Sequence, residues 1–449
     1  MSRISTLIGR AQDAEIIRQL ALQGKCVALV GVSNLGKTAL MRHLCHSDPH
    51  NPHGAFVYVD GNALPTRTGR AFFILIWRAL AEKIQAHRAD AALQTRQVGD
   101  EILAANDPTQ FAFAFERGLA LALDALPHPL ALCLDDFDEA YQTLEPQVFL
   151  NLRAYKDRAG DTLVYVTATE CELGHLTQSR EQGEFLELLA PHTHFLSFMT
   201  AADTRTLCEQ FAAREGVTFS AADLAFIREN ADGHPGIAQA VCGALGGVTG
   251  APVRGAHGDR VIHQLVQQSL VNEPNVQSEL EKIWRDLKPA EQAVLLDASF
   301  ARQATPGEET HNAARRSLRA KSILRDGDDS EIFSRLFADF VRRRRLVQQP
   351  SARGVDIDVN TGNVYVEGKP VEALTDLEFR LLLFLYGRLD HVCDKYAIVQ
   401  GVWGEDYIDE VDDARIEKLI SRARAKIEPD PAKPKYLVSV RGRGYKLVR

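Results

Sequence analysis

The segment around residues 26–45 constrains the fold more than any other part of the chain. The apolar run Cys26–Val30 predicts a buried strand, and residues 37–45 predict an amphipathic helix. Between them lies Gly31–Thr38, GVSNLGKT, which fits G-x-x-x-x-G-K-[ST] in its required strand–loop–helix context. Glycines let the backbone curl so that N–H groups point at phosphate oxygens, and the helix N-terminus adds positive charge. We therefore predict a phosphate-binding loop, the P-loop.

The P-loop predicts ATP and Mg²⁺ as cofactors. Lys37 is expected to pair with the β and γ phosphates, and Thr38 is expected to ligate Mg²⁺. Further contacts are expected from the rest of the loop and the first turn of its helix. The predicted set is Gly31, Asn34, Leu35, Gly36, Lys37, Thr38 and Ala39.

A pair of carboxylates follows the apolar run Leu130–Leu134 further along the chain. We expect Asp135 to hold Mg²⁺ through water and Asp136 to orient or deprotonate the attacking water. Lys37, Asp135 and Asp136 are thus the candidate catalytic residues. Two alternatives remain open: the acids form a solvated turn, or Asp138 or Glu139 takes the second role.

Strands and helices alternate over the first 190 residues, which predicts a parallel sheet covered on both faces. The other predicted strands are Ala55–Asp60 and Leu163–Thr167, and the other helical stretches are 70–85 and 111–125. Residues 200–245 are helical in pattern, and the glycine-rich segment 243–258 predicts a hinge. The predicted domains are 1–195, the α/β core; 196–258, a helical segment; 259–349, a helical domain with a small hairpin; and 354–449.

Four segments together resemble the STAND and Orc-type AAA+ ATPases over about residues 5–345. They are Leu7–Arg10, the P-loop, the Asp135–Asp136 strand end and Gly233–Pro235. The resemblance implies a P-loop core, a helical lid and a middle winged helix, with slow ATP hydrolysis and nucleotide-dependent homo-oligomerisation. It also implies that Ile8, Gly9 and Arg10 lie against the adenine and that His234 and Pro235 lie near the phosphates. Taken by itself, Gly-His-Pro is equally a helix start with proline in the first turn.

The chain departs from that family after the strand at residues 163–169. Glu170 stands where many relatives place an arginine, so a nucleotide-sensing role would fall to Thr167 or Thr169. Arg153 and Arg158 are candidates for contacting a neighbouring subunit, with a solvated helix face as the alternative.

The net charge of −8 conceals a basic C-terminus, because residues 415–449 hold 11 Lys or Arg against three acids. At 100° per residue two neighbouring stripes form on one predicted helix. The apolar stripe is Ile416, Ile420, Ala423 and Ile427; the basic stripe is Arg415, Lys418, Arg422 and Lys426. The basic stripe predicts contact with guanine edges or phosphates in the major groove, and Leu419 is expected to touch a thymine methyl.

Strand-like residues 436–440 and 445–448 flank Arg441–Gly444, which predicts a hairpin carrying Arg441 and Arg443 to the minor groove or the DNA backbone. With Leu374–Leu382, Val402–Gly404 and Val411–Asp413, this hairpin resembles the OmpR/PhoB-type winged helix over residues 354–449. The resemblance implies a winged helix-turn-helix that binds double-stranded DNA, a small sheet over Val355–Val366, and an RNA polymerase contact at Glu405–Glu410. A protein-docking winged helix is the alternative.

The remaining features favour a cytoplasmic protein that does not enter a membrane. The longest apolar runs are far shorter than the roughly 18–20 residues that span a bilayer. Seven cysteines without a C-x-x-C pair indicate reduced thiols. Two functions fit: an ATP-dependent DNA-binding regulator of transcription, or a DNA-remodelling or antiphage-defence ATPase such as an initiator, transposition helper or phage sensor.

Overall fold

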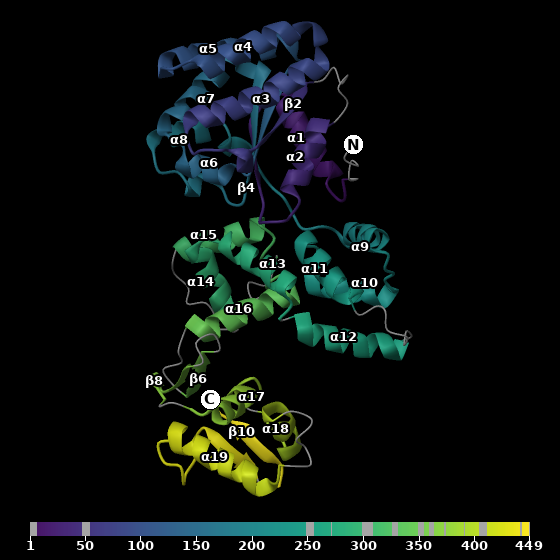
Figure 1. Ribbon diagram of the computed structural model, residues 1–449, viewed down its shortest axis with the longest axis vertical. Coiled ribbons are helices and arrows are strands. Elements are labelled where there is room, and N and C mark those ends of the chain that lie inside the picture. Colours follow the sequence, from purple (N-terminus) through teal and green to yellow (C-terminus); the bar gives the residue numbers. More distant parts are fainter. Residues whose placement is uncertain are drawn as a thin grey trace. The chain divides into compact units, whose positions relative to one another are not determined.

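The fold is described here from a computed structural model, in which the chain forms two units, Met1–Phe340 and Val341–Arg449. The described residues are 7–46, 54–247, 256–270, 272–298, 309–325, 331–348, 354–358, 363–371, 374–389, 391–403, 411–440 and 442–448. The boundary between the units falls inside the helix α16, and each unit is described by itself (Figure 1).

The N-terminal unit is built around a five-stranded parallel sheet of order β2-β3-β4-β1-β5. The strands are β1 (Val27–Val30), β2 (Ala55–Asp60), β3 (Leu130–Asp135), β4 (Leu163–Thr169) and β5 (Thr193–Phe195). Every residue of β1, β3 and β4 is buried, as expected for parallel strands covered on both faces. The sequence predicted the first four strands but not β5, a three-residue edge strand that is only half-buried.

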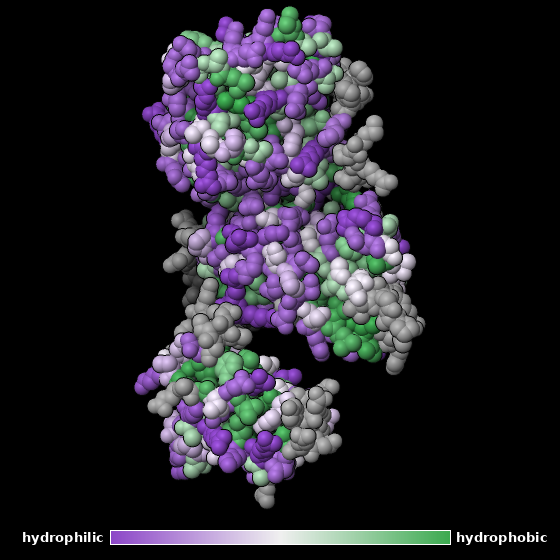
Figure 2. Space-filling model, viewed as in Figure 1, coloured by the Kyte–Doolittle hydropathy of each residue, from purple (hydrophilic) through white to green (hydrophobic). Residues whose placement is uncertain are grey.

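Helices enclose this sheet and are held together largely by aromatic side chains. Three rings pack against one another: the centroid of Phe115 of α5 lies 4.7 Å from that of Phe73 of α3 and 5.5 Å from that of Tyr155 of α7, and the centroids of Phe73 and Tyr155 are 6.0 Å apart. In the face drawn in Figure 2 the surface of this layer is mainly hydrophilic. The helices are α1 (Ala11–Leu22), α2 (Lys37–His46), α3 (Gly69–His87), α4 (Ala92–Ala104), α5 (Pro108–Ala125), α6 (Phe137–Thr143), α7 (Pro146–Ala159) and α8 (Arg180–Leu186).

Two helical segments complete the unit (Figure 1). The first contains α9 (Ala201–Glu215), α10 (Ala221–Ala231) and α11 (Pro235–Gly246). The second contains α12 (Ala256–Leu270), α13 (Pro274–Arg285), α14 (Pro289–Ala298), α15 (Glu309–Ala320) and the first part of α16 (Arg335–Gln348), up to Phe340. The hairpin predicted in the second segment is present as an antiparallel bridge between Leu324 and Ile332. A buried ion pair, Lys321 Nζ to Glu291 Oε1 at 2.9 Å, joins the end of α15 to α14.

The C-terminal unit places three helices between two small sheets. The first sheet, β6 (Val355–Asp358), β7 (Asn363–Val366) and β8 (Lys369–Pro370), confirms the small sheet predicted over Val355–Val366. The helices are α17 (Asp376–Tyr386), α18 (Lys395–Val402) and α19 (Asp413–Ile427), and the hairpin is β9 (Leu437–Val440) with β10 (Gly444–Leu447). One apolar core runs through all three helices and both sheets.

All seven cysteines are free thiols. Among the described residues, no helix combines the length and the apolar character that crossing a bilayer would require.

Candidate phosphate site and nucleic-acid surface

The predicted P-loop connects the carboxyl end of β1 to the first turn of α2. Asn34 and Gly36 have φ values of 58° and 100°, so the backbone has positive φ at two positions within the loop. Gly36 suits this left-handed conformation because it has no Cβ. Successive N–H groups in such a loop form a concave anion site, and the N-terminus of α2 reinforces it.

Lys37 is buried at the start of α2, with 6% of its surface exposed. Its Nζ donates hydrogen bonds to the carbonyl oxygens of Gly31, at 2.6 Å, and Val32, at 3.2 Å. The ammonium group therefore folds back over the mouth of the loop. Thr38, the next residue, is half-buried and lines the adjoining cavity.

The predicted carboxylate pair lies at the same edge of the sheet, because β4 separates β1 from β3 and all three strands are parallel. Asp135 is fully buried, and its Oδ2 accepts a hydrogen bond from the Tyr58 hydroxyl at 2.8 Å. Asp136 adopts a left-handed backbone, φ 47°, and its Oδ2 accepts from Asn62 Nδ2 at 2.6 Å. Burial and the neighbouring Asp135 raise the pKa of Asp136.

The residues at this edge fit a magnesium ion. Asp135 Oδ1 is buried and has no hydrogen-bond partner among the described residues, which leaves a hard oxygen acceptor beside the P-loop. No group of three or more His, Cys, Asp or Glu in the described chain forms a protein-only metal cage. Mg²⁺ needs none, because it usually binds through one or two protein oxygens, substrate phosphates and water.

Of the three acids considered for the role of general base, Asp136 is the one that lines the cavity. Asp138 accepts hydrogen bonds from the Glu170 backbone N–H at 3.0 and 3.1 Å, and burial together with Glu170 raises its pKa to about 6. Glu139 is exposed and paired with Arg67. The geometry therefore favours Asp136 over both alternatives.

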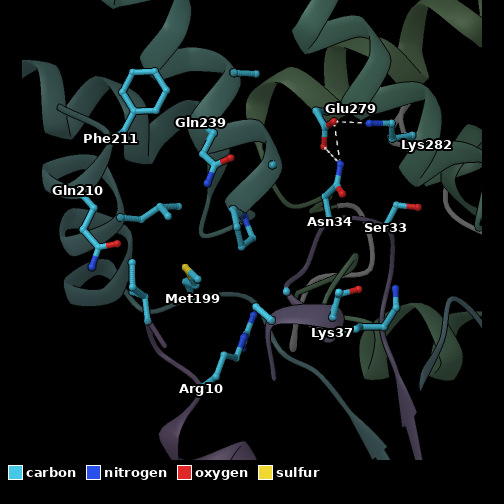
Figure 3. Close-up of a pocket in the computed structure, with 18 of the residues that line it drawn as sticks. Arg10, Ser33, Asn34, Lys37, Met199, Gln210, Phe211, Gln239, Glu279 and Lys282 are labelled. Carbon is cyan, nitrogen blue, oxygen red and sulfur yellow. Dashed lines mark hydrogen bonds and ion pairs between the residues drawn. The ribbon is translucent and has the colours of Figure 1, made fainter. Parts of the chain in front are cut away.

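A cavity of about 1560 Å³ opens over the P-loop, bounded by α2, α9, α11 and α13 (Figure 3). This volume exceeds the roughly 300–1,000 Å³ typical of small-molecule sites. The predicted site residues that line it are Ile8, Arg10, Asn34, Gly36, Lys37, Thr38, Ala39, Asp136 and Pro235. The other predicted site residues, Gly9, Gly31, Leu35, Asp135 and His234, do not line it.

Arg10 supports the P-loop directly. Its side chain is 2% exposed, and one guanidinium nitrogen donates to the Leu35 carbonyl oxygen at 2.9 Å. Burial lowers the pKa of Arg10, and Asp13 partly offsets this shift. The preceding Gly9 lies against Asp203 of α9. The segment predicted to meet the adenine thus also joins the P-loop to the helical segment that follows the core.

His234 lies at the N-terminus of α11 and reaches the P-loop. Its Nδ1 accepts from the Ile237 N–H at 3.3 Å, so Nε2 carries the proton and donates to the Ser33 carbonyl oxygen at 3.1 Å. The ring is fully buried, and this burial lowers its pKa from 6.5 to about 4. A neutral histidine therefore couples α11 to the loop.

We expect acidification to weaken the docking of α11. Because the folded pKa of His234 lies below 6.5, its contribution is complete above about pH 6.5 and is lost as the pH falls toward 4. Between pH 6.5 and 5 the contribution of His234 to the free energy of folding falls by about 2 kcal/mol. Hydrogen-exchange protection of α11 at pH 7 and pH 5 measures it.

The control for this measurement is His234→Asn, which keeps a capping oxygen but cannot titrate. Asp138 and Asp286, whose raised pKa values act in the opposite direction, are common to both proteins. The variant is expected to lose less protection on acidification. An identical pH dependence in the two proteins would contradict the assignment.

The structure adds carboxylates that the sequence did not point to. Asp286, directly after α13, accepts a hydrogen bond from the Ser33 backbone N–H at 2.5 Å. Glu279 of α13 accepts from Asn34 Nδ2 at 2.7 and 2.9 Å, and Glu170 accepts from the Ser33 hydroxyl at 2.8 Å. No local pattern signals the contacts of Asp286 and Glu279, because they lie about 250 residues from the P-loop.

Other predicted residues lie elsewhere in the core. The hydroxyls of Thr167 and Thr169 are buried in β4 without a hydrogen-bond partner among the described residues. Arg153 is paired with Asp157 and Glu187, and Arg158 is paired with Glu116. Both arginines thus have partners within the chain.

The basic helix predicted near the C-terminus is α19. Its apolar stripe is buried as predicted, with Ile416, Ile420, Ala423 and Ile427 each at most 2% exposed. On the neighbouring side Arg415, Lys418 and Arg422 are exposed, and their side chains form no ion pair or hydrogen bond within the described part of the chain. These three cations are available to an anionic partner.

Two residues of the predicted DNA surface contact other parts of the domain instead of facing solvent. Leu419 is 6% exposed and belongs to the apolar core, because the packing around α19 reaches beyond the predicted apolar stripe to this position. Contact with a base is therefore excluded in this arrangement. Lys426 is partly buried, and its Nζ pairs with Glu378 of α17 at 2.7 Å. Packing against α17, which the helical periodicity did not include, decides its position.

The predicted hairpin is formed by β9 and β10, and Arg443 is exposed in the turn between them. Arg441 and the segment Glu405–Glu410 lie outside the described residues. Arg424, which the sequence did not single out, donates to the Leu437 carbonyl oxygen at 2.8 Å and to the Ser439 hydroxyl at 2.9 Å. Arg424 thereby fixes the hairpin against α19.

Residues 368–447 match the family described as "Transcriptional regulatory protein, C terminal". The C-terminal domain is a winged helix of the OmpR/PhoB type. The sensory transduction protein RegX3 of Mycolicibacterium smegmatis is 41% identical over 93 residues, which are 21% of this chain and 40% of that protein. RegX3 of Mycobacterium tuberculosis is 37% identical over 131 residues, 29% of this chain and 51% of that protein. The chain spans about half the length of the curated relatives it matches.

Solved structures similar to the chain fall into two groups. The DNA-binding domain of Klebsiella pneumoniae RstA, in complex with its RstA box, is 28% identical and covers 22% of this chain and 94% of its own, with a TM-score of 0.20. A Walker-type ATPase of Pyrococcus abyssi is 13% identical and covers 75% and 96%, with a TM-score of 0.45. Cdc6p from Pyrobaculum aerophilum is 14% identical and covers 82% and 93%, with a TM-score of 0.36.

The chain therefore joins an OmpR/PhoB-type domain to an ATPase-like fold. The second part of this statement rests on the chain's own geometry: a P-loop after β1, a carboxylate strand two places away in the same parallel sheet, and a cavity over both.

Proposed function

We propose that the chain is an ATP-dependent DNA-binding regulator of transcription. One observation carries the proposal: a P-loop cavity with its acidic strand and a winged helix of the transcriptional-regulator type belong to the same chain. In this proposal the domains are residues 1–195, 196–258, 259–349 and 354–449, which are the core, lid, middle winged helix and DNA-binding domain.

The nucleotide half of the proposal follows from the charges around the P-loop. The loop N–H groups and Lys37 bind the phosphates, and Asp136, at the cavity wall, orients or deprotonates water. Bound Mg²⁺, held by Thr38 and through water by Asp135, would neutralise charge on the phosphates. Ile8 and Arg10 border the cavity where the base is expected, and His234 joins α11 to the loop.

The DNA half of the proposal rests on the exposed cations of α19 and its hairpin. Arg415, Lys418 and Arg422 lie on one exposed side of a helix whose other side is packed, and such a helix fits the major groove. Arg443 would reach the minor groove or the backbone. Relatives such as RegX3 are named sensory transduction proteins, which fits a regulatory role. An RNA polymerase contact through residues 405–410 belongs to the same proposal.

Coupling between nucleotide binding and DNA binding requires that ATP bind one conformer of the chain better than another. We propose slow hydrolysis, nucleotide-dependent homo-oligomerisation and a cytoplasmic location. Since Arg153 and Arg158 have partners within the chain, a contact from either to a second subunit would first have to replace the present ion pairs.

DNA affinity measured with ATP, with ADP and without nucleotide tests the proposal. Wild-type affinity is expected to differ between nucleotide states, and Lys37→Ala is expected to remove the difference. If wild type and Lys37→Ala bind DNA and assemble alike in every state, the coupled switch is wrong. ATPase rates with and without DNA test the alternative, because strong stimulation by DNA without nucleotide-dependent affinity favours a remodelling or defence ATPase.

A further inference from the structure

The charged face of α13 forms one wall of the cavity over the P-loop. Glu279, Lys282, Arg285 and Asp286 all line the cavity, although they come from a segment far from the P-loop in the sequence. Residues 279, 282 and 286 recur at helical spacing, so they share one side of α13 and its C-terminal end. Figure 3 shows Glu279 joined by dashed lines to Asn34 of the P-loop and to Lys282.

The acids of this face occupy donors of the P-loop. Asp286 accepts a hydrogen bond from the Ser33 backbone N–H at 2.5 Å, and the two carboxylate oxygens of Glu279 accept from Asn34 Nδ2 at 2.7 and 2.9 Å. Gly236, in the first turn of α11, leaves room for this arrangement, since a Cβ there would lie 2.1 Å from Glu279 Oε2. Carboxylate and phosphate oxygens compete for the same kind of donor. A phosphate chain in the loop would have to displace the carboxylates of Glu279 and Asp286.

The bases of the same face are placed to receive the anion that displaces the acids. Lys282 Nζ pairs with Glu279 Oε1 at 2.7 Å, so movement of Glu279 frees its charge. Arg285 is exposed, borders the cavity, and forms no ion pair or hydrogen bond within the ranges that the structure describes. The wall thus holds two acids bound to the loop, a lysine paired with one of them, and an arginine without a partner among the described residues.

We propose that α13 is the second wall of the phosphate site: Glu279 and Asp286 bind the P-loop in place of phosphate, and Lys282 and Arg285 bind the terminal phosphate of a nucleoside triphosphate. The proposal rests on the proposed nucleotide-binding function and adds to it. Replacing the acid contacts with phosphate contacts would distinguish ATP from ADP. Only ATP carries the γ-phosphate, which lies furthest from the base and would be the phosphate nearest to Lys282 and Arg285 of α13. The same replacement would also transmit nucleotide state to the helical segment α12–α16.

Nucleotide affinities of full-length variants test the proposal, with ATP and ADP each displacing a fluorescent nucleotide. The measurement is made at pH 8, because burial and the nearby Glu170 raise the pKa of Asp286 to about 7. Asp286→Asn and Glu279→Gln remove a competing anion and are expected to raise both affinities about threefold to tenfold. Arg285→Gln is expected to lower ATP affinity about tenfold and to change ADP affinity less than twofold. Arg180→Gln, an exposed arginine of α8 away from the cavity, is the control.

The proposal predicts changes of opposite sign: the acid variants raise nucleotide affinity, and the arginine variant lowers ATP affinity. A purely structural α13 would give losses for acids and base alike, and Arg285→Gln weakening ATP and ADP equally would also overturn the proposal. Should the variants misfold, hydrogen exchange of wild-type residues 274–286 with ATP, with ADP and without nucleotide replaces them, and unchanged exchange overturns the proposal. Failure of the wild type to bind nucleotide would instead reject the proposed function itself.

Discussion

Replacing Lys37 with alanine is expected to lower the affinity for ATP and ADP by about 100-fold or more. In the structure the Lys37 ammonium is held at the mouth of the P-loop by the carbonyl oxygens of Gly31 and Val32. A phosphate chain would offer it charged acceptors instead, and each such hydrogen bond is worth about 1.5–3 kcal/mol. Two of them correspond to about 100-fold or more in affinity. Displacement of a fluorescent nucleotide from the full-length chain measures the loss.

Lys25→Ala is the matched control, because this lysine is exposed and precedes β1 rather than following it. The control variant should bind ATP like the wild type. Circular dichroism and thermal melting check that the Lys37 variant remains folded. Unchanged affinity in a folded Lys37→Ala protein would show that Gly31–Thr38 does not bind phosphate in this chain.

Neutralising Arg422 and Arg443 together is expected to weaken DNA binding by about 100-fold at roughly 0.1 M salt. Both side chains are exposed, one on α19 and the other in the β9–β10 turn, so neither loss should disturb the core. Base contacts are worth about 1–3 kcal/mol each. If the arginines bind phosphates instead, the slope of log affinity against log salt should fall by about two. Titration of a fluorescent duplex at several salt concentrations separates these cases.

The matched control is Arg380→Ala with Arg388→Ala, which removes the same charge from the same domain but not from α19 or the hairpin. Arg380 pairs with Asp376, and Arg388 lies over the ring of Phe384. The control pair should retain most of the wild-type affinity. Equal losses in both double variants would mean that net charge, rather than this surface, governs binding. Intact binding at low salt without Arg422 and Arg443 would reject the predicted surface.

Local pattern was sufficient for most elements of the fold. Apolar runs in a strand–helix alternation predicted β1 to β4, because buried parallel strands are apolar on both faces. It was insufficient for β5, which is short and half-buried, and its pairing with β1 depends on the rest of the sheet. The apolar stripe of α19 is buried as predicted, and three of the four residues of the predicted basic stripe are exposed. The position of Leu419 was not predicted correctly, since its burial depends on what packs around the helix.

Motif spacing placed the P-loop and the Asp135–Asp136 pair, but it could not show how their side chains are held. Tyr58 and Asn62, which accompany β2, donate to Asp135 and Asp136 respectively. The order of strands in the sheet creates these contacts, and no short pattern encodes them. The same holds for Arg10, whose bond to the Leu35 carbonyl crosses from the N-terminal segment to the loop.

The sequence by itself determined the chemistry available to this protein: a loop shaped for phosphate, an acidic strand end, and a basic helix with a basic hairpin. These depend on residues close together in the chain, where backbone geometry sets the spacing. The tertiary structure decided which groups are free to act. Glu378 pairs with Lys426, which is therefore not part of the exposed basic side. Glu279 of α13 and Asp286, which follows α13, accept hydrogen bonds from the P-loop. Such partners come from distant segments, and only the packing of the whole unit brings their charges within hydrogen-bonding distance.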